Sequence, residues 1–167
     1  LWDEFTPYLY EIEASWNVDG KTDTQTRTFG MRNVEQGKHH IRLNGRNIHL
    51  RGVLDCAVFP LTGYPSTNVD DWKRIFTTIK EYGMNHVRFH SWCPPEAAFC
   101  AADEMGLYLE IECSSWANQS TTIGDGRPLD RFIWDESERI VATFGNHPSF
   151  CMMMYGNEPA GEGSSAY

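Results

Sequence analysis

The sequence predicts an α/β fold comprising the first half of a (β/α)8 TIM barrel, preceded by a shorter antiparallel β region. Two observations predict it. Residues 1–47 show strand alternation and strong turn dipeptides without helical periodicity. From residue 48 onward, apolar strand patterns alternate with amphipathic helix patterns, as expected of parallel strands joined by helical crossovers. We therefore expect two domains: an antiparallel portion at 1–47 and the truncated N-terminal half of a barrel at 48–167.

The antiparallel region contains four predicted strands, at residues 8–18, 22–29, 32–35 and 39–43. Asp19-Gly20 lies between the first two and is a strong hairpin signal. Asn44-Gly45 is a second such signal after the last strand. The region therefore reads as a series of antiparallel strands joined by tight turns.

The barrel region contains four predicted strands, at residues 48–54, 84–89, 107–111 and 150–156. Three predicted helices separate them, with inward faces formed by Trp72, Ile75, Phe76 and Ile79, by Ala98, Phe99, Ala102 and Met105, and by Ile133, Ile140, Val141 and Phe144. Thr67 or Asn68 is placed to cap the first helix, and Gly83, Gly106 and Gly145 to end the three. An open doubly wound sheet shares this periodicity, but no Gly-rich phosphate loop follows the first strand.

The fourth strand runs through an apolar segment without alternation and stops at Asn157-Glu158-Pro159. Such a run is typical of a parallel strand covered on both faces. Pro159 cannot donate a ladder hydrogen bond, so the strand should end near it. The sequence thus predicts that a buried strand delivers Glu158 to the carboxyl end of the sheet, where barrels place their chemistry. A surface turn is the alternative for this tripeptide.

Composition excludes several function classes. A net charge of -9 argues against a nucleic-acid partner, which requires clustered Lys and Arg. The chain has no run of 18 apolar residues, and we expect no membrane partner. The five cysteines lack CxxC pairing and are expected to be buried free thiols. No HExxH spacing or Gly-x-Ser-x-Gly elbow is present, so we expect no metal, no cofactor and no serine esterase chemistry.

Polar and aromatic residues follow each predicted barrel strand. The candidates for substrate binding or catalysis are Asp55, His90, Trp92, Glu112, Trp116, Asn157 and Glu158. Carboxylates, a histidine and tryptophans match the needs of a carbohydrate site, because the acids transfer protons and flat aromatic faces pack on sugar rings. The sequence therefore predicts a carbohydrate substrate.

Most of these candidates also have a structural alternative. His90 can serve as a core histidine, and Asp55 can stabilise a turn. Glu112 can form an ion pair with Arg88 on the neighbouring strand. The two tryptophans, Trp92 and Trp116, can cap the barrel rim, because large aromatics fill loop cores as often as they bind ligands.

Several segments resemble glycoside hydrolase family 2, which includes β-galactosidases, β-glucuronidases and β-mannosidases. The resemblance covers nearly the whole chain and rests on segments in the right order, namely Pro7-Tyr8-Leu9-Tyr10, Phe29-Gly30-Met31-Arg32, Leu50-Arg51-Gly52-Val53, Met84-Asn85-His86-Val87-Arg88, Asp103-Glu104-Met105-Gly106-Leu107-Tyr108 and Gly145-Asn146-His147-Pro148-Ser149 continuing to Gly156-Asn157-Glu158-Pro159. It implies that residues 1–47 are part of an immunoglobulin-like β-sandwich.

The resemblance also implies a retaining exo-β-glycosidase, with β-galactosides as the first expectation. In it, Glu158 is the general acid/base and Asn157 contacts the sugar 2-hydroxyl, while the nucleophilic glutamate lies on a later strand. The chain would then be a fragment of a longer polypeptide, inactive by itself, whose partners are the rest of that polypeptide and a second copy in a homo-oligomer. A periplasmic or extracellular location is expected if the parent degrades polysaccharide. The alternative is a non-catalytic carbohydrate-binding or scaffold fragment.

The sequence departs from the family pattern in two places. His90-Ser91-Trp92-Cys93-Pro94 stands where many relatives carry Ser-His-Tyr-Pro, and Leu54-Asp55 stands where β-galactosidases carry Asn-Arg-His. Counterparts of the magnesium ligands of some β-galactosidases are not evident either. Both substitutions line the expected sugar pocket and bear on which sugar is bound.

Overall fold

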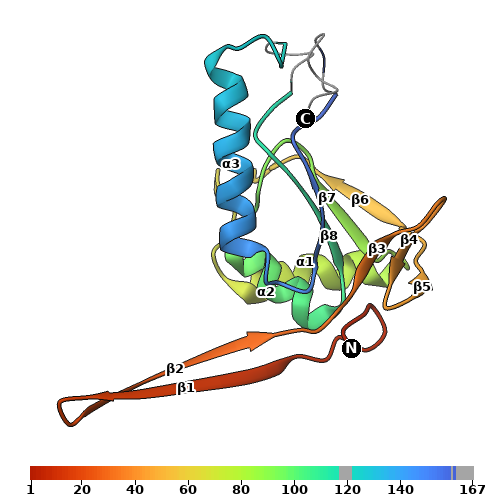
Figure 1. Cartoon of the computed structure of the whole chain (residues 1–167). Coiled ribbons are helices and arrows are strands. Elements are labelled where there is room, and N and C mark those ends of the chain that lie inside the picture. Colours follow the sequence, from red (N-terminus) through yellow and green to blue (C-terminus); the bar gives the residue numbers. More distant parts are fainter. Residues whose placement is uncertain (117–121, 159, 161–167) are drawn as a thin grey trace.

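The computed structural model describes residues 1–116, 122–158 and 160. Its first part is antiparallel. Strands β1 (Tyr10–Val18) and β2 (Lys21–Phe29) form a long hairpin that projects away from the rest of the chain (Figure 1). Asp19 and Gly20 have φ values of 52° and 78°, which is the geometry of the expected two-residue turn.

A second antiparallel sheet follows, formed by β3 (Val34–Gln36), β4 (Ile41–Leu43) and β5 (Arg46–Asn47). Asn44 and Gly45 have positive φ at its second turn, as their sequence predicts. The residues of the β1–β2 hairpin are exposed on both faces except Phe29, which is half-buried, whereas a sandwich buries the inner face of each sheet. The immunoglobulin-like identity of residues 1–47 and the boundary at 47 therefore stay predictions.

The second part is a four-stranded parallel sheet with three helices. Its elements are β6 (Gly52–Asp55), α1 (Val69–Glu81), β7 (His86–Phe89), α2 (Glu96–Met105), β8 (Tyr108–Glu112), α3 (Pro128–Phe144) and β9 (Phe150–Met154). The strands lie in the order β6-β7-β8-β9 (Figure 1). A barrel adds its strands in this sequential order, whereas a doubly wound sheet reverses direction at a switch point, so the order favours the barrel.

The helices begin and end where local chemistry requires it. The Asn68 side chain caps α1 by accepting a hydrogen bond from the Asp70 amide at 2.8 Å. Gly106 ends α2 in the left-handed conformation with φ of 72°, and Pro128 occupies the first turn of α3. The prediction that Val141 lies on the inward face of α3 is wrong, because this residue is 53% exposed.

The main core lies between the parallel sheet and the helices. Alternate residues of β7 and β8 are apolar and fully buried there, among them Phe89 and Ile111, packed with Phe76, Phe99 and Ile133. Period-two alternation then turns the intervening residues of both strands to the opposite face of the sheet. This second face carries charged side chains, which form the site described below.

Strand β9 differs from its prediction. It ends at Met154, two residues earlier than expected, and Met154 is 47% exposed rather than covered. Since β9 pairs only with β8 among the described strands, it lies at an edge of the sheet. Strand β6, at the other edge, begins at Gly52 rather than Ile48. Pro159, expected to stop the strand, lies outside the described residues.

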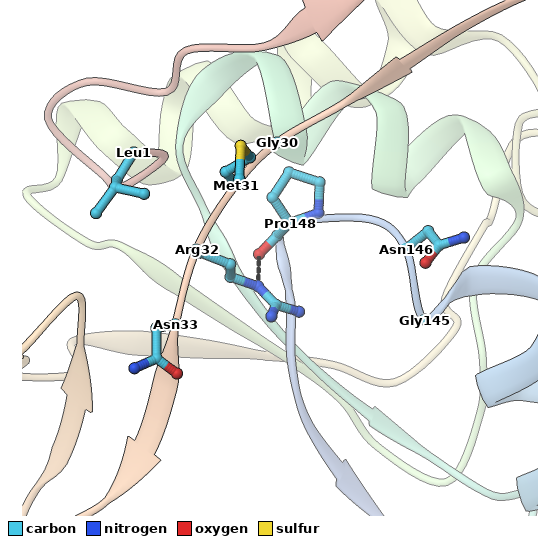
Figure 2. A pocket seen from close by; sticks show the side chains of 8 residues that line it. All are labelled: Leu1, Gly30, Met31, Arg32, Asn33, Gly145, Asn146 and Pro148. Atoms are coloured by element: carbon cyan, nitrogen blue, oxygen red, sulfur yellow. Dashed lines mark hydrogen bonds between the residues drawn. The ribbon is translucent and has the colours of Figure 1, made fainter. Parts of the chain in front are cut away.

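Trp2 and Arg32 are among the described residues that join the antiparallel part to the parallel sheet. The fully buried Trp2 packs edge-on against Tyr108 and donates its indole N–H to the Asp103 carbonyl at 2.7 Å. Arg32 donates to the Pro148 carbonyl at 2.5 Å and also bonds the Phe150 carbonyl, at the start of β9. Figure 2 shows Arg32 reaching Pro148 across a pocket between the two segments. The Arg32 bonds therefore join the antiparallel part to the start of β9.

The five cysteines are free thiols, of which Cys113 is buried and Cys56 exposed. Burial raises the pKa of Cys93 to about 12 and that of Cys151 to about 11. In the part of the chain that the structure describes, no helix has the length and apolar character needed to cross a bilayer.

Candidate active site

A buried ion pair joins β7 and β8 on the charged face of the sheet. Arg88 Nε lies 2.6 Å and Nη2 2.5 Å from Glu112 Oε1. The Glu112 side chain has no exposed surface, and Arg88 retains 34% of its own. Glu110 approaches the same guanidinium at 3.3 Å. Glu112 therefore forms the ion pair with Arg88 that was expected as its structural alternative.

The second oxygen of Glu112 is also occupied. Ser91 donates its backbone N–H to Glu112 Oε2 at 2.6 Å. Ser91 has a φ of 60°, a left-handed conformation that is uncommon outside glycine and is enriched at functional sites. Both Glu112 oxygens thus accept hydrogen bonds within the protein, and the contact of Glu112 with substrate stays a prediction.

Asn157 lies just beyond β9 and is fixed by its backbone and its side chain. Its amide N–H donates to the Ser115 carbonyl at 2.9 Å, and the residue forms a parallel bridge with Trp116. Its side-chain Oδ1 accepts a hydrogen bond from Arg88 Nη2 at 2.7 Å. Gly156 precedes it with φ of 145°, and a Cβ there would lie 2.5 Å from the Ser115 oxygen. Only glycine permits this approach of the two segments.

Glu158 is the exposed carboxylate of the site. It follows the buried Asn157, has a φ of 43°, and accepts a hydrogen bond from the Trp116 indole N–H at Oε2 over 2.7 Å. Trp116 also contacts the His90 ring edge to face, with centroids 4.7 Å apart. Four predicted site residues, His90, Trp116, Asn157 and Glu158, are therefore linked at the carboxyl ends of the strands.

The other two candidates, Asp55 and Trp92, lie in structural contacts. Trp92 packs against Phe59, Trp72 and Phe89 with ring centroids 5.3 to 6.5 Å apart, and its indole donates to the Asp55 carbonyl at 3.1 Å. This is the rim-packing alternative for Trp92, and its role as a sugar platform stays a prediction.

Asp55 stabilises a turn. Its Oδ1 accepts the Ala57 N–H at 2.8 Å, which is the alternative role expected for it. Burial raises the pKa of Asp55, against the effect of the Ala57 hydrogen bond, which favours the charged form. Its contact with substrate stays a prediction.

Within the described residues, no group of three or more His, Cys, Asp or Glu side chains is arranged to hold a metal ion. The described buried side-chain polar atoms all have hydrogen-bond partners. The absence of a metal or cofactor in the full protein stays a prediction.

Sequence reasoning missed the bond from Arg88 to Asn157 and the bond from the Ser91 amide to Glu112. A signal for the first was present, because His86 and Arg88 alternate along β7 and must share a face. The Ser91 amide bond depends on a left-handed serine, which no residue pattern announces.

Comparisons with known proteins agree with this architecture. Residues 34–167 match the family described as "Glycosyl hydrolases family 2, TIM barrel domain". A β-galactosidase of Lactococcus lactis is 29% identical and covers 99% of this chain, which spans 17% of that protein. A β-galactosidase of Thermoanaerobacterium thermosulfurigenes is 28% identical over 91% of this chain and 20% of its own length.

Solved structures show the same fold. A β-glucuronidase from Parabacteroides merdae superposes with a TM-score of 0.78 at 25% identity, covering 96% of this chain and 20% of its own. A β-D-glucuronidase from Dictyoglomus thermophilum gives a TM-score of 0.85 at 21% identity, covering all of this chain and 30% of its own. These likenesses and the family match confirm the predicted TIM-barrel portion. The chain spans 17% and 20% of the length of the two β-galactosidases.

Proposed function

The chain belongs to glycosyl hydrolase family 2, and from that premise we propose that it supplies the acid/base side of the active site of a retaining exo-β-glycosidase. Its proposed substrates are terminal β-linked sugars, with β-galactosides first. The relatives named above are β-galactosidases by sequence and β-glucuronidases by structure, so both sugar classes belong in the test.

One observation carries the proposal. The carboxylate of Glu158 is exposed at the carboxyl end of the fourth parallel strand and is held by the Trp116 indole at 2.7 Å. A general acid/base must reach the leaving oxygen and then a water molecule, so it needs an open approach and a fixed position. Glu158 has both, whereas Glu112 is buried and fully engaged.

The neighbouring residues supply sugar contacts in this proposal. Asn157 presents an amide beside Glu158, and His90 and Trp116 form an adjoining aromatic edge. Hydrogen-bonding groups next to a flat apolar surface suit a pyranose ring, which has hydroxyls on its rim and C–H groups on its faces. Asp55, Trp92 and Glu112 also make packing or hydrogen-bond contacts that position their neighbours.

A retaining mechanism requires a second carboxylate as nucleophile, about 5–5.5 Å from the acid/base. We assign it to a later strand, outside residues 1–167, as the resemblance implies. Glu158 first protonates the leaving oxygen while the nucleophile bonds the anomeric carbon. It then removes a proton from the water that releases the sugar.

The test uses the full-length protein and a panel of nitrophenyl β-glycosides, including the galactoside and the glucuronide. We expect hydrolysis of at least one, with the β-anomer as the first product by proton NMR. Glu158→Gln should lower turnover of substrates with poor leaving groups by about 100- to 10,000-fold. Glu138→Gln, on the exposed surface of α3, is the matched control and should leave turnover unchanged. An α-anomeric first product would refute retention, and sugar binding without hydrolysis would favour the carbohydrate-binding alternative.

A further inference from the structure

We propose that Arg88 is a positioning residue that, anchored by Glu112, holds the Asn157 side-chain amide with its NH2 group turned toward the sugar. The proposal rests on the proposed function, since it assigns a task to Asn157 in the same site. It concerns how that amide is oriented rather than which residue transfers the proton.

The orientation of the amide follows from donor and acceptor chemistry. A guanidinium group carries only donors, so the Asn157 atom 2.7 Å from Arg88 Nη2 must be the oxygen, Oδ1. The Nδ2 group therefore points away from Arg88. Asn157 is 7% exposed, and its backbone is held at Ser115, so the side chain has little room to adopt other positions.

Arg88 can impose this orientation because it is itself held. A partly exposed arginine ordinarily samples several rotamers, but here both Nε and Nη2 lie within 2.6 Å of the same Glu112 oxygen. Glu112 in turn cannot rotate freely, because its other oxygen accepts the Ser91 N–H and its side chain is fully buried. The chain of contacts from Ser91 through Glu112 and Arg88 ends at Asn157.

The fixed orientation has a chemical consequence at the sugar. An Asn157 that only donates leaves the proton of the contacted sugar hydroxyl free to bond another acceptor, such as the nucleophilic carboxylate. If the amide turned by 180°, its oxygen would instead compete for that proton. Arg88 therefore decides whether the hydroxyl acts as acceptor or as donor toward Asn157.

A double-mutant cycle on kcat/KM tests the coupling in the full-length protein. Arg88→Lys keeps a cation beside Glu112 but lacks the fork that reaches both partners. It should lower kcat/KM for the preferred β-glycoside by about 10- to 100-fold, and by less than about 3-fold when Asn157 is already Ala. The 2-deoxy analogue lacks the hydroxyl that Asn157 is expected to contact, so on this substrate Arg88→Lys should lower kcat/KM by less than about 3-fold. Equal losses in the Asn157→Ala background and on the 2-deoxy substrate would overturn the proposal.

A second measurement does not depend on activity. Ligand-free neutron crystal structures distinguish Nδ2 from Oδ1 by the deuterons on the amide nitrogen. In the wild type Oδ1 should face Arg88, whereas in Arg88→Lys the amide should be turned or split between two orientations. An Asn157 amide with the same orientation in both structures would refute the positioning role. If the wild-type protein hydrolyses no glycoside, the proposed function fails while this structural comparison still decides the inference. Asn157→Asp provides a second variant should Arg88→Lys fold poorly. Its carboxylate still accepts from Arg88 but has no NH2 group for the sugar, so kcat/KM should fall by about 10- to 100-fold, and an unchanged kcat/KM would overturn the proposal.

Discussion

Replacing Glu112 with Gln should destabilise this part of the protein strongly. The carboxylate has no exposed surface and accepts hydrogen bonds on both oxygens, from Arg88 on one and from the Ser91 N–H on the other. Glutamine has a single acceptor oxygen, so its NH2 group must face one of these donors. Arg88 is 34% exposed and keeps Glu110 at 3.3 Å, so the cost is that of one donor left without an acceptor at a fully buried side chain, about 1–3 kcal/mol.

Urea denaturation, followed by tryptophan fluorescence, measures this cost. The matched control is Glu136→Gln, because Glu136 also pairs with an arginine, Arg139, at 2.7 Å, but on an open helix surface where Arg139 is 60% exposed. Such surface pairs contribute about 0–1 kcal/mol. We expect the Glu112→Gln midpoint to fall well below that of the control. Equal losses in the free energy of unfolding for the two variants would refute the reasoning that the buried Glu112 carboxylate contributes more than a surface pair.

Three further predictions concern the neighbouring residues. Trp116→Phe keeps a ring but loses the hydrogen bond to Glu158. In the full-length protein, kcat/KM should fall by about 10- to 100-fold for glycosides with poor leaving groups and little for a dinitrophenyl glycoside. Equal losses on both kinds of substrate would contradict the positioning role of the indole. Trp92→Ala should lower the free energy of unfolding by about 3–5 kcal/mol, because it removes a ring from an aromatic cluster. A raised KM with an unchanged free energy of unfolding would instead support its role as a sugar platform. Asp55→Asn should stabilise the protein at neutral pH. Burial raises the pKa of Asp55 in the folded state, so ionisation of this carboxyl favours the unfolded state at every pH above its unfolded pKa of about 3.9. The gain should vanish in urea titrations at pH values below that pKa, and a gain that persists there would contradict the electrostatic cause.

Much of the fold follows from local sequence signals. The turn at Asp19-Gly20, the Asn68 cap and the Gly106 helix end are short-range features, and each occurs where its residues predict it. The position of the candidate residues Asn157 and Glu158 just beyond the fourth strand was predictable too, because the apolar run stops there at polar residues. These signals depend only on neighbouring residues.

The features that sequence reasoning missed depend on tertiary contacts. Val141 and Met154 are apolar and fit the helical and strand patterns, yet both are largely exposed, because burial depends on which elements cover them. The Arg88 to Asn157 bond joins residues 69 positions apart. Periodicity places Arg88 on the right face, but only the pairing of β7, β8 and β9 brings Asn157 within its reach.

Azide trapping with Glu158→Gln tests the central claim most directly. With a dinitrophenyl β-glycoside, the full-length variant should still form the glycosyl-enzyme, because a good leaving group needs no proton, but should release the sugar slowly, because no base activates water. A burst of dinitrophenol should appear, and added azide should restore turnover and yield the β-glycosyl azide, since azide needs no deprotonation. If Glu158→Gln slows activated and unactivated substrates equally and no glycosyl azide forms, Glu158 is not the acid/base.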